Sequence, residues 1–130
     1  MILNKAFHSA IKEGMTVFNC SSTVSAELVF KDLVGKKGKV ITGMTVDNET
    51  PVDVIYINAG YKTLSVLKRF EEALTLSRPN VFISVEILNS YTFTIKDILN
   101  YMISIGYMNL KLDKGQYAFT YEYHPSKVLL

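Results

Sequence analysis

One short run of the sequence, Val54-Ile55-Tyr56-Ile57, is apolar at every position. A strand with one buried face and one wet face alternates apolar and polar residues, whereas an unbroken apolar run is typical of a strand buried on both faces. We therefore expect residues 54–57 to form a central strand that is covered on two sides. This requirement constrains the fold more than any other feature of the sequence.

The spacing of apolar residues and the positions of turn residues divide the rest of the chain into helices and strands. Helices are predicted at 3–13, 23–34, 62–76 and 95–105. Strands are predicted at 15–20, 39–46, 52–58, 81–88, 107–112 and 117–124. Gly35 and Gly106 follow the second and fourth helical patterns, where a glycine commonly ends a helix.

Two pairs of neighbouring strands are predicted to form antiparallel hairpins. The loop between 39–46 and 52–58 consists of turn-forming residues, and the strands at 107–112 and 117–124 are joined by a short turn at 113–116. The element order α-β-α-ββ-α-β-α-ββ then predicts one α+β domain over residues 1–130, with a mixed or antiparallel sheet and about four helices.

Composition sets the class of protein and its expected compartment. Apolar residues make up 48% of the 130 residues and charged residues 20%, which is typical of a globular protein. No run approaches the roughly 20 apolar residues that span a bilayer. A chain with one cysteine forms no internal disulfide, so we expect a cytoplasmic protein without a membrane partner.

Charge and ligand residues exclude several functions. The formal net charge of +2 falls short of the basic balance expected of a domain that binds phosphate backbones, so nucleic acid is not an expected partner. The two histidines lie at opposite ends of the chain and the single cysteine has no spaced partner, so we expect no metal and no cofactor.

The only cysteine, Cys20, lies between a predicted strand and a predicted helix. A thiolate at a helix N-terminus can be reactive, so Cys20 is the reactive-thiol candidate. A phosphatase loop would need an arginine six positions later, where the sequence has Ala26. The favoured interpretation is a buried apolar residue before an ordinary helix cap.

A second candidate is the turn after the central strand, with Gly60 and Lys62. It is not a P-loop, because the glycine five positions before a Gly-Lys-Ser/Thr triplet is missing and Tyr61 separates Gly60 from Lys62. We interpret it as a turn and a helix cap, with anion binding by free N–H groups and Lys62 as the alternative.

Three lysines, Lys36, Lys37 and Lys39, occupy the turn between the second helix and the following strand. A solvated turn explains them, and binding of a phosphate-bearing ligand is the alternative.

A stripe of aromatic residues follows one face of the last strand: Tyr117, Phe119, Tyr121 and Tyr123. Pairing of Leu112 and Leu110 with Tyr117 and Phe119 would set the register of the hairpin. The stripe is interpreted either as core or, since tyrosines retain a polar tip, as an interface.

Tyr101 and Ile103 lie away from the core face of the fourth helix and extend the set of interface candidates.

The sequence contains no recognisable catalytic set. We therefore predict a non-enzymatic binding or regulatory protein that acts through a protein partner or as a homo-oligomer. Its bias toward Lys, Ile and Asn is what AT-rich coding would produce, which suggests a phage or mobile-element accessory or inhibitor protein. The alternatives are a small enzyme or binder of a small anionic ligand, with a cleft near Cys20 and Gly60–Lys62, and a weak nucleic-acid binder.

Overall fold

A computed structural model describes residues 10–21, 24–43, 50–59, 62–84, 95–107, 110–113 and 116–119. In chain order its elements are β1 (Thr16–Cys20), α2 (Val24–Val34), β2 (Lys39–Thr42), β3 (Val54–Ile57), α3 (Thr63–Arg69), α4 (Glu71–Leu76), β4 (Asn80–Ser84), α5 (Ile95–Ser104), β5 (Leu110–Asp113) and β6 (Gln116–Phe119). Within the described residues, helices and strands occur close to where the sequence predicts them, while most of the helix predicted at 3–13 lies outside those residues.

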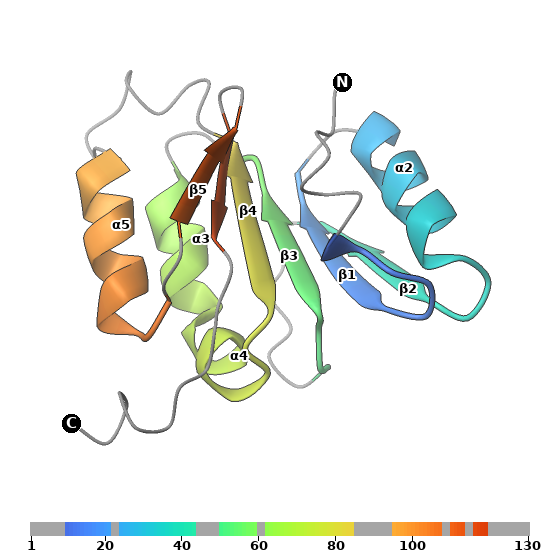
Figure 1. The fold of residues 1–130 in the computed structure, drawn as a ribbon, viewed down its shortest axis with the longest axis horizontal. Coiled ribbons are helices and arrows are strands. Elements are labelled where there is room, and N and C mark those ends of the chain that lie inside the picture. The colour runs from blue at the N-terminus through green and yellow to red at the C-terminus, as the bar shows by residue number, and fades with distance from the viewer. Residues whose placement is uncertain are drawn as a thin grey trace.

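The described strands form one sheet in the order β2-β1-β3-β4-β6-β5. The neighbours β2, β1, β3 and β4 are all parallel, while β6 runs antiparallel to β4 and to β5. Figure 1 shows α2 on one side of this sheet and α3, α4 and α5 on the other. The architecture is a three-layer α/β fold of the Rossmann-like type.

The predicted α+β fold and its first hairpin are wrong. Residues 39–42 and 54–57 do not pair, because β1 lies between β2 and β3 and is parallel to both. The physical reason is burial: β3 is apolar at every position and β1 is buried from Val17 to Cys20, and their pairing at the centre of the sheet buries both faces of each strand. The prediction of a central strand covered on two sides is confirmed.

Alternation along the strands divides the core into two layers. On one face Val17 and Tyr56 pack with Phe30 of α2, and the rings of Phe30 and Tyr56 meet edge to face at 5.4 Å. On the other face Phe18 packs against Phe70 at 4.8 Å. Successive residues of a strand therefore contact the helices on opposite faces of the sheet in alternation.

The helix predicted at 62–76 is two helices, which meet at Phe70. The Phe70 N–H donates to the carbonyls of both Val66 and Leu67, so the last turn of α3 tightens before α4 begins. Gly35 (φ 68°) and Gly106 (φ 97°) end α2 and α5, as predicted, in the left-handed conformation that glycine adopts without strain.

The second hairpin is confirmed for the described residues. Leu110 pairs with Phe119 and Leu112 with Tyr117, which is the predicted register. Within the parts of the chain that the structure describes, every helix is too short or too polar to cross a membrane.

Candidate functional site

The sheet has one point where the connections after adjacent parallel strands leave in opposite directions. From β1 the chain passes through α2 to β2, and from β3 it passes through α3 and α4 to β4 on the other face. β1 and β3 are neighbours and end together, with Cys20 opposite Ile57. In open α/β sheets, the crevice at the carboxyl ends of such strands is where ligands bind.

A buried hydrogen-bond network holds the carboxyl ends of β1 and β2 together. The Ser21 hydroxyl donates to Asn19 Oδ1 at 2.8 Å, and Asn19 Nδ2 donates to Thr42 Oγ1 at 3.4 Å. The Gly43 N–H donates to the Asn19 carbonyl at 3.1 Å. Asn19 is completely buried, so these bonds replace the water that its amide loses on folding.

Asn58 lies directly after β3 at the same edge. Its N–H donates to the Cys20 carbonyl at 3.0 Å, which fixes its backbone beside the end of β1. Its side chain is half-buried and makes no hydrogen bond to the described part of the chain. A carboxamide held in this way offers one acceptor and two N–H donors to a ligand.

Cys20 lies at the same edge but points into the core. It is fully buried in the cluster that contains Val66 and Leu67. Burial raises the pKa of the Cys20 thiol to about 11, and the positive charge of Arg69 offsets only part of that effect. The thiol is therefore protonated at neutral pH, which does not support the reactive thiolate considered from the sequence.

The two groups of predicted anion-binding residues lie at opposite ends of the sheet. Lys62 immediately precedes α3, past the carboxyl end of β3, and Gly60 lies outside the described residues. Lys36 and Lys37 lie in the turn that leads into β2, and Lys39 is the first residue of that strand, so all three lie at the amino end of the parallel strands. The structure does not bring the two groups together.

The predicted interface residues are also separated. Tyr117 and Phe119 are in β6, which pairs with β4 on one edge and β5 on the other, while Tyr121 and Tyr123 lie outside the described residues. On α5, Ile103 is 65% exposed and the Tyr101 hydroxyl donates to Glu71 Oε1 at 2.9 Å. Their role as an interface stays a prediction.

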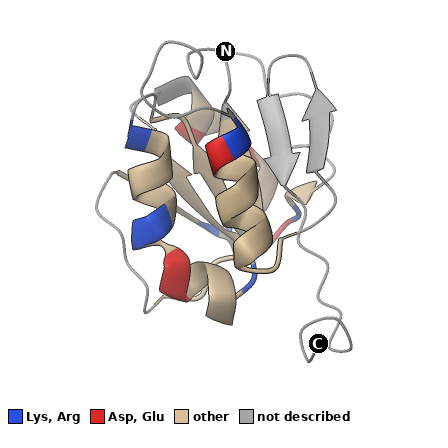
Figure 2. Cartoon of the chain, turned by 90° about the vertical axis from the view of Figure 1, so that its left-hand side faces the viewer, with Lys and Arg blue, Asp and Glu red and all other residues tan. Residues whose placement is uncertain are grey.

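The charges on α3, α4 and α5 lie toward the helix ends, as Figure 2 shows. Lys96 and Asp97 lie in the first turn of α5, and the rest of that helix is uncharged.

Among the described residues, no group of three or more His, Cys, Asp or Glu side chains is arranged to hold a metal ion.

The chain matches no protein-family model, and no curated protein sequence is similar to it. Solved structures that are similar in fold include two methyltransferases. One is a SAM-dependent methyltransferase from Aquifex aeolicus, with a TM-score of 0.59 and 16% identity over 88% of this chain and 86% of that one. The other is a release factor-specific protein-(glutamine-N5) methyltransferase from Alicyclobacillus acidocaldarius subsp. acidocaldarius DSM 446, with a TM-score of 0.56 and 12% identity over 92% and 89%.

This chain therefore has a Rossmann-like methyltransferase fold. Two expectations from the sequence are corrected by these likenesses: a non-enzymatic protein that acts through protein–protein contacts, and a phage accessory or inhibitor protein. Both structures that share the fold are those of methyltransferases. Sequence reasoning placed Asn58 in the cleft considered near Cys20 and Lys62, but it did not single out Asn19, whose side chain is buried at the same edge. The sequence pattern that points to such residues is an asparagine within or directly after an apolar strand. A buried amide needs hydrogen-bond partners, which a neighbouring side chain or a ligand supplies.

Proposed function

We propose that this chain binds SAM (S-adenosylmethionine) at the carboxyl ends of β1 and β3 and acts as a methyltransferase. The observation that carries the proposal is the fold, since two methyltransferases match about nine tenths of this chain and of their own. The direction change between β1 and β3 supports the place, because ligands of open α/β sheets bind at that point.

The residues at this edge fit the chemistry of SAM. The turn after β1 begins with Ser21 and contains no glycine before α2, unlike the turns that let backbone approach a pyrophosphate. SAM carries no phosphate, so it does not require that approach. Its base and sugar can form hydrogen bonds with the Asn58 carboxamide and the Thr42 hydroxyl, and its carboxylate can be attracted by Lys62.

The roles of these residues follow from their places. Asn58 would orient the ligand through its carboxamide, and Lys62 would attract the ligand carboxylate. When bound, SAM supplies a methyl group on a positively charged sulfur that a nucleophile of the acceptor attacks. Cys20 is not that nucleophile, since its thiol is buried and protonated.

The test is calorimetric titration of the purified protein with SAM, followed by transfer of tritiated methyl groups from SAM to a cell extract. We expect binding, and Asn58→Ala should weaken it roughly three- to tenfold through loss of hydrogen bonds. Asn100→Ala is the matched control, because Asn100 is exposed on α5, and it should bind SAM normally. A folded protein that binds no SAM at millimolar concentration would overturn the proposal.

A further inference from the structure

The strand β2 forms one edge of the described sheet, and its outer side has no described partner. Among the described strands, β2 pairs with β1 alone. The N–H groups of Lys39 and Gly43 donate to carbonyl groups on the β1 side of the strand. Backbone groups alternate in direction along a strand, so the N–H and C=O groups of Val40 and Thr42 point away from the sheet. This edge can therefore accept a further strand.

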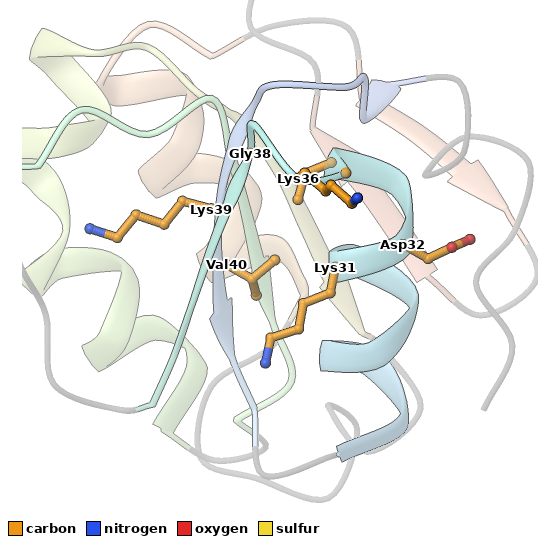
Figure 3. Close-up of a pocket in the computed structure, with 8 residues that line it drawn as sticks. Lys31, Asp32, Lys36, Gly38, Lys39 and Val40 are labelled. Atoms are coloured by element: carbon orange, nitrogen blue, oxygen red, sulfur yellow. The ribbon is translucent and has the colours of Figure 1, made fainter.

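The helix α2 presents charged and apolar side chains above this open edge. A hollow of about 520 Å³ beside the edge is lined by Lys31 of α2 and Val40 of β2, and Lys31 extends toward the strand in Figure 3. Asp32 also lines the hollow, but its carboxylate points away from the strand. Glu27 forms an ion pair with Lys31 at 3.3 Å and so lies on the same side of the helix. Leu28, which is 62% exposed, lies on that side too, three residues before Lys31.

The sequence of β2 is complementary to itself in the antiparallel direction. A two-fold axis perpendicular to the sheet at Ile41 would pair β2 with β2 of a second copy, so that Val40 of each copy exchanges backbone hydrogen bonds with Thr42 of the other. The half-buried Ile41 would then face Ile41, and the exposed Lys39 would face Gly43, which has no side chain. Parallel pairing in register would place Lys39 opposite Lys39, and like charges in that position are destabilising.

The positions of the helices are compatible with this pairing. The helix α2 packs over β1 and β2 on one face of the sheet. A two-fold axis perpendicular to the sheet leaves both copies of α2 on the same face, side by side and antiparallel. Strands in a sheet are about 4.8 Å apart, so the two helices would be about 10 Å apart, which is close to the distance between packed helices.

The charges on α2 are complementary in the same arrangement. The helix runs antiparallel to β2, because it connects two parallel strands, and Lys31 lies at the level of Val40. Glu27 lies about 6 Å earlier along the helix axis, and Thr42 lies about 6.6 Å further along the strand. An axis at Ile41 therefore passes between Glu27 and Lys31, and Glu27 of each copy faces Lys31 of the other. This complementarity identifies a second copy of the chain as the occupant of the edge.

We propose that two copies of this chain associate through β2 and α2 and form one continuous sheet. The contact differs from the aromatic stripe considered from the sequence, whose described residues lie in β6. It does not rest on SAM binding, because it uses only the edge strand and the helix that covers it.

The test is sedimentation equilibrium of the full chain at concentrations up to about 1 mM, where we expect a species of twice the chain mass. Glu27→Lys places lysines opposite lysines and should weaken association at least about tenfold. Lys31→Glu should do the same, and a mixture of the two variants should form a heterodimer. Glu27→Lys together with Lys31→Glu in one chain keeps opposite charges facing each other, so association should stay within about threefold of that of the natural chain.

Asp32→Lys is the matched control, since it changes the charge by the same amount as Glu27→Lys on a side chain that points away from the edge. It should weaken association less than about twofold. Val40→Pro tests the strand pairing itself, because it removes an N–H that points outward, which an edge strand tolerates. We expect a monomer with an unchanged far-UV circular dichroism spectrum.

A natural chain that stays monomeric at about 1 mM would overturn the proposal. A dimer that both Val40→Pro and Glu27→Lys leave unchanged would use another surface and would overturn it as well. Equal weakening by Asp32→Lys and Glu27→Lys would mean general repulsion between charged molecules, with the same consequence. The side chains of Glu27 and Lys31 are 28% and 59% exposed, so their variants are expected to fold.

Discussion

The two ends of the parallel strands are built differently. At the amino end, a charged group is used for structure: Asp53 Oδ2 accepts the Thr16 N–H at 2.9 Å, and the Asp53 carbonyl accepts the Asn80 N–H at 3.0 Å. These bonds join β1, β3 and β4. At the carboxyl end, Asn19 is bonded to Ser21 and Thr42, whereas the Asn58 carboxamide makes no hydrogen bond to the described residues.

The difference indicates that the amino end of the strands serves stability and that the carboxyl end leaves a polar group available to a ligand. Hydrogen bonds within the chain stabilise the amino end. The buried Tyr107 hydroxyl makes another of these bonds, since it donates to the Pro79 carbonyl at 2.7 Å. A group left open at the carboxyl end contributes little to stability and remains available to a ligand. Four predictions test this comparison, from the largest expected effect on the free energy of unfolding to the smallest.

Gly38→Ala should have the largest effect. The added Cβ would meet the Val34 side chain at 2.3 Å and its carbonyl at 2.6 Å, so the turn or the helix must shift, and we expect a loss of about 2–3 kcal/mol in urea unfolding. Gly14→Ala is the control, because Gly14 has a positive φ but open space around it, and it should lose only about 1 kcal/mol. Equal losses would show that backbone strain, and not close packing, decides the cost at this end.

Alkaline pH should destabilise the protein through Cys20. The pKa of the thiol rises from 9.0 to about 11 on folding, so the folded state favours the protonated form. The stabilisation is fully present below pH 9 and is lost as the pH rises through about 11, with a total of roughly 2–3 kcal/mol. The measurement is urea unfolding between pH 8 and pH 11.

Cys20→Ala is the control for that measurement, since it removes the titrating group and leaves the lysines and tyrosines that ionise in the same range. Its stability should fall less between pH 8 and pH 11 than that of the natural chain. Parallel curves for the two proteins, or rapid modification of Cys20 by a thiol reagent at pH 7, would contradict the buried and protonated state.

Tyr107→Phe should lose about 1–2 kcal/mol of stability. It removes one hydroxyl and leaves the buried Pro79 carbonyl without that donor. Tyr101→Phe is the matched control, because the Tyr101 hydroxyl bonds to Glu71 in a more exposed position and should contribute no more than about 0.5 kcal/mol. Thermal unfolding followed by circular dichroism compares the two variants. A larger loss from Tyr101→Phe would place the stabilising contact between α4 and α5 instead.

Asn58→Ala should have the smallest effect, within about 0.5 kcal/mol, because the side chain makes no hydrogen bond to the described residues. Asn19→Ala, at the same end, removes a buried amide bonded to Ser21 and Thr42 and should lose about 1–3 kcal/mol. Urea unfolding without ligand distinguishes them. A large loss from Asn58→Ala would mean that this residue also serves the fold and would end the contrast between the two ends.

Local chemistry allowed much of the secondary structure to be predicted. The glycines after α2 and α5 and the alternation in β5 and β6 act over a few residues, so the helix ends and the register of the last hairpin could be inferred from neighbours alone. The pairing of 39–42 with 54–57 failed for the opposite reason. A loop of turn-forming residues is compatible with a hairpin and with a connection between parallel strands, and β1, far earlier in the chain, occupies the place between them.

The candidate site was predicted only in part. The sequence drew attention to the turns after β1 and β3, and the structure places both at the carboxyl edge. It named Cys20 as the reactive-thiol candidate but favoured a buried apolar residue, and the structure buries the thiol and raises its pKa. The side chain of Asn58, by contrast, makes no hydrogen bond to the described residues. Which of two adjacent side chains faces a crevice depends on the packing of helices from other parts of the chain.

The sequence by itself determined that residues 54–57 form a strand covered on both faces, because that property is carried by four consecutive apolar side chains. It also determined where most helices end. Only the tertiary structure decided that the central strands run parallel, that the fold is that of methyltransferases, and that the lysines near residue 36 and Lys62 lie at opposite ends of the sheet. Those outcomes depend on which strands become neighbours, and that choice is made by burial of apolar surface summed over the whole chain.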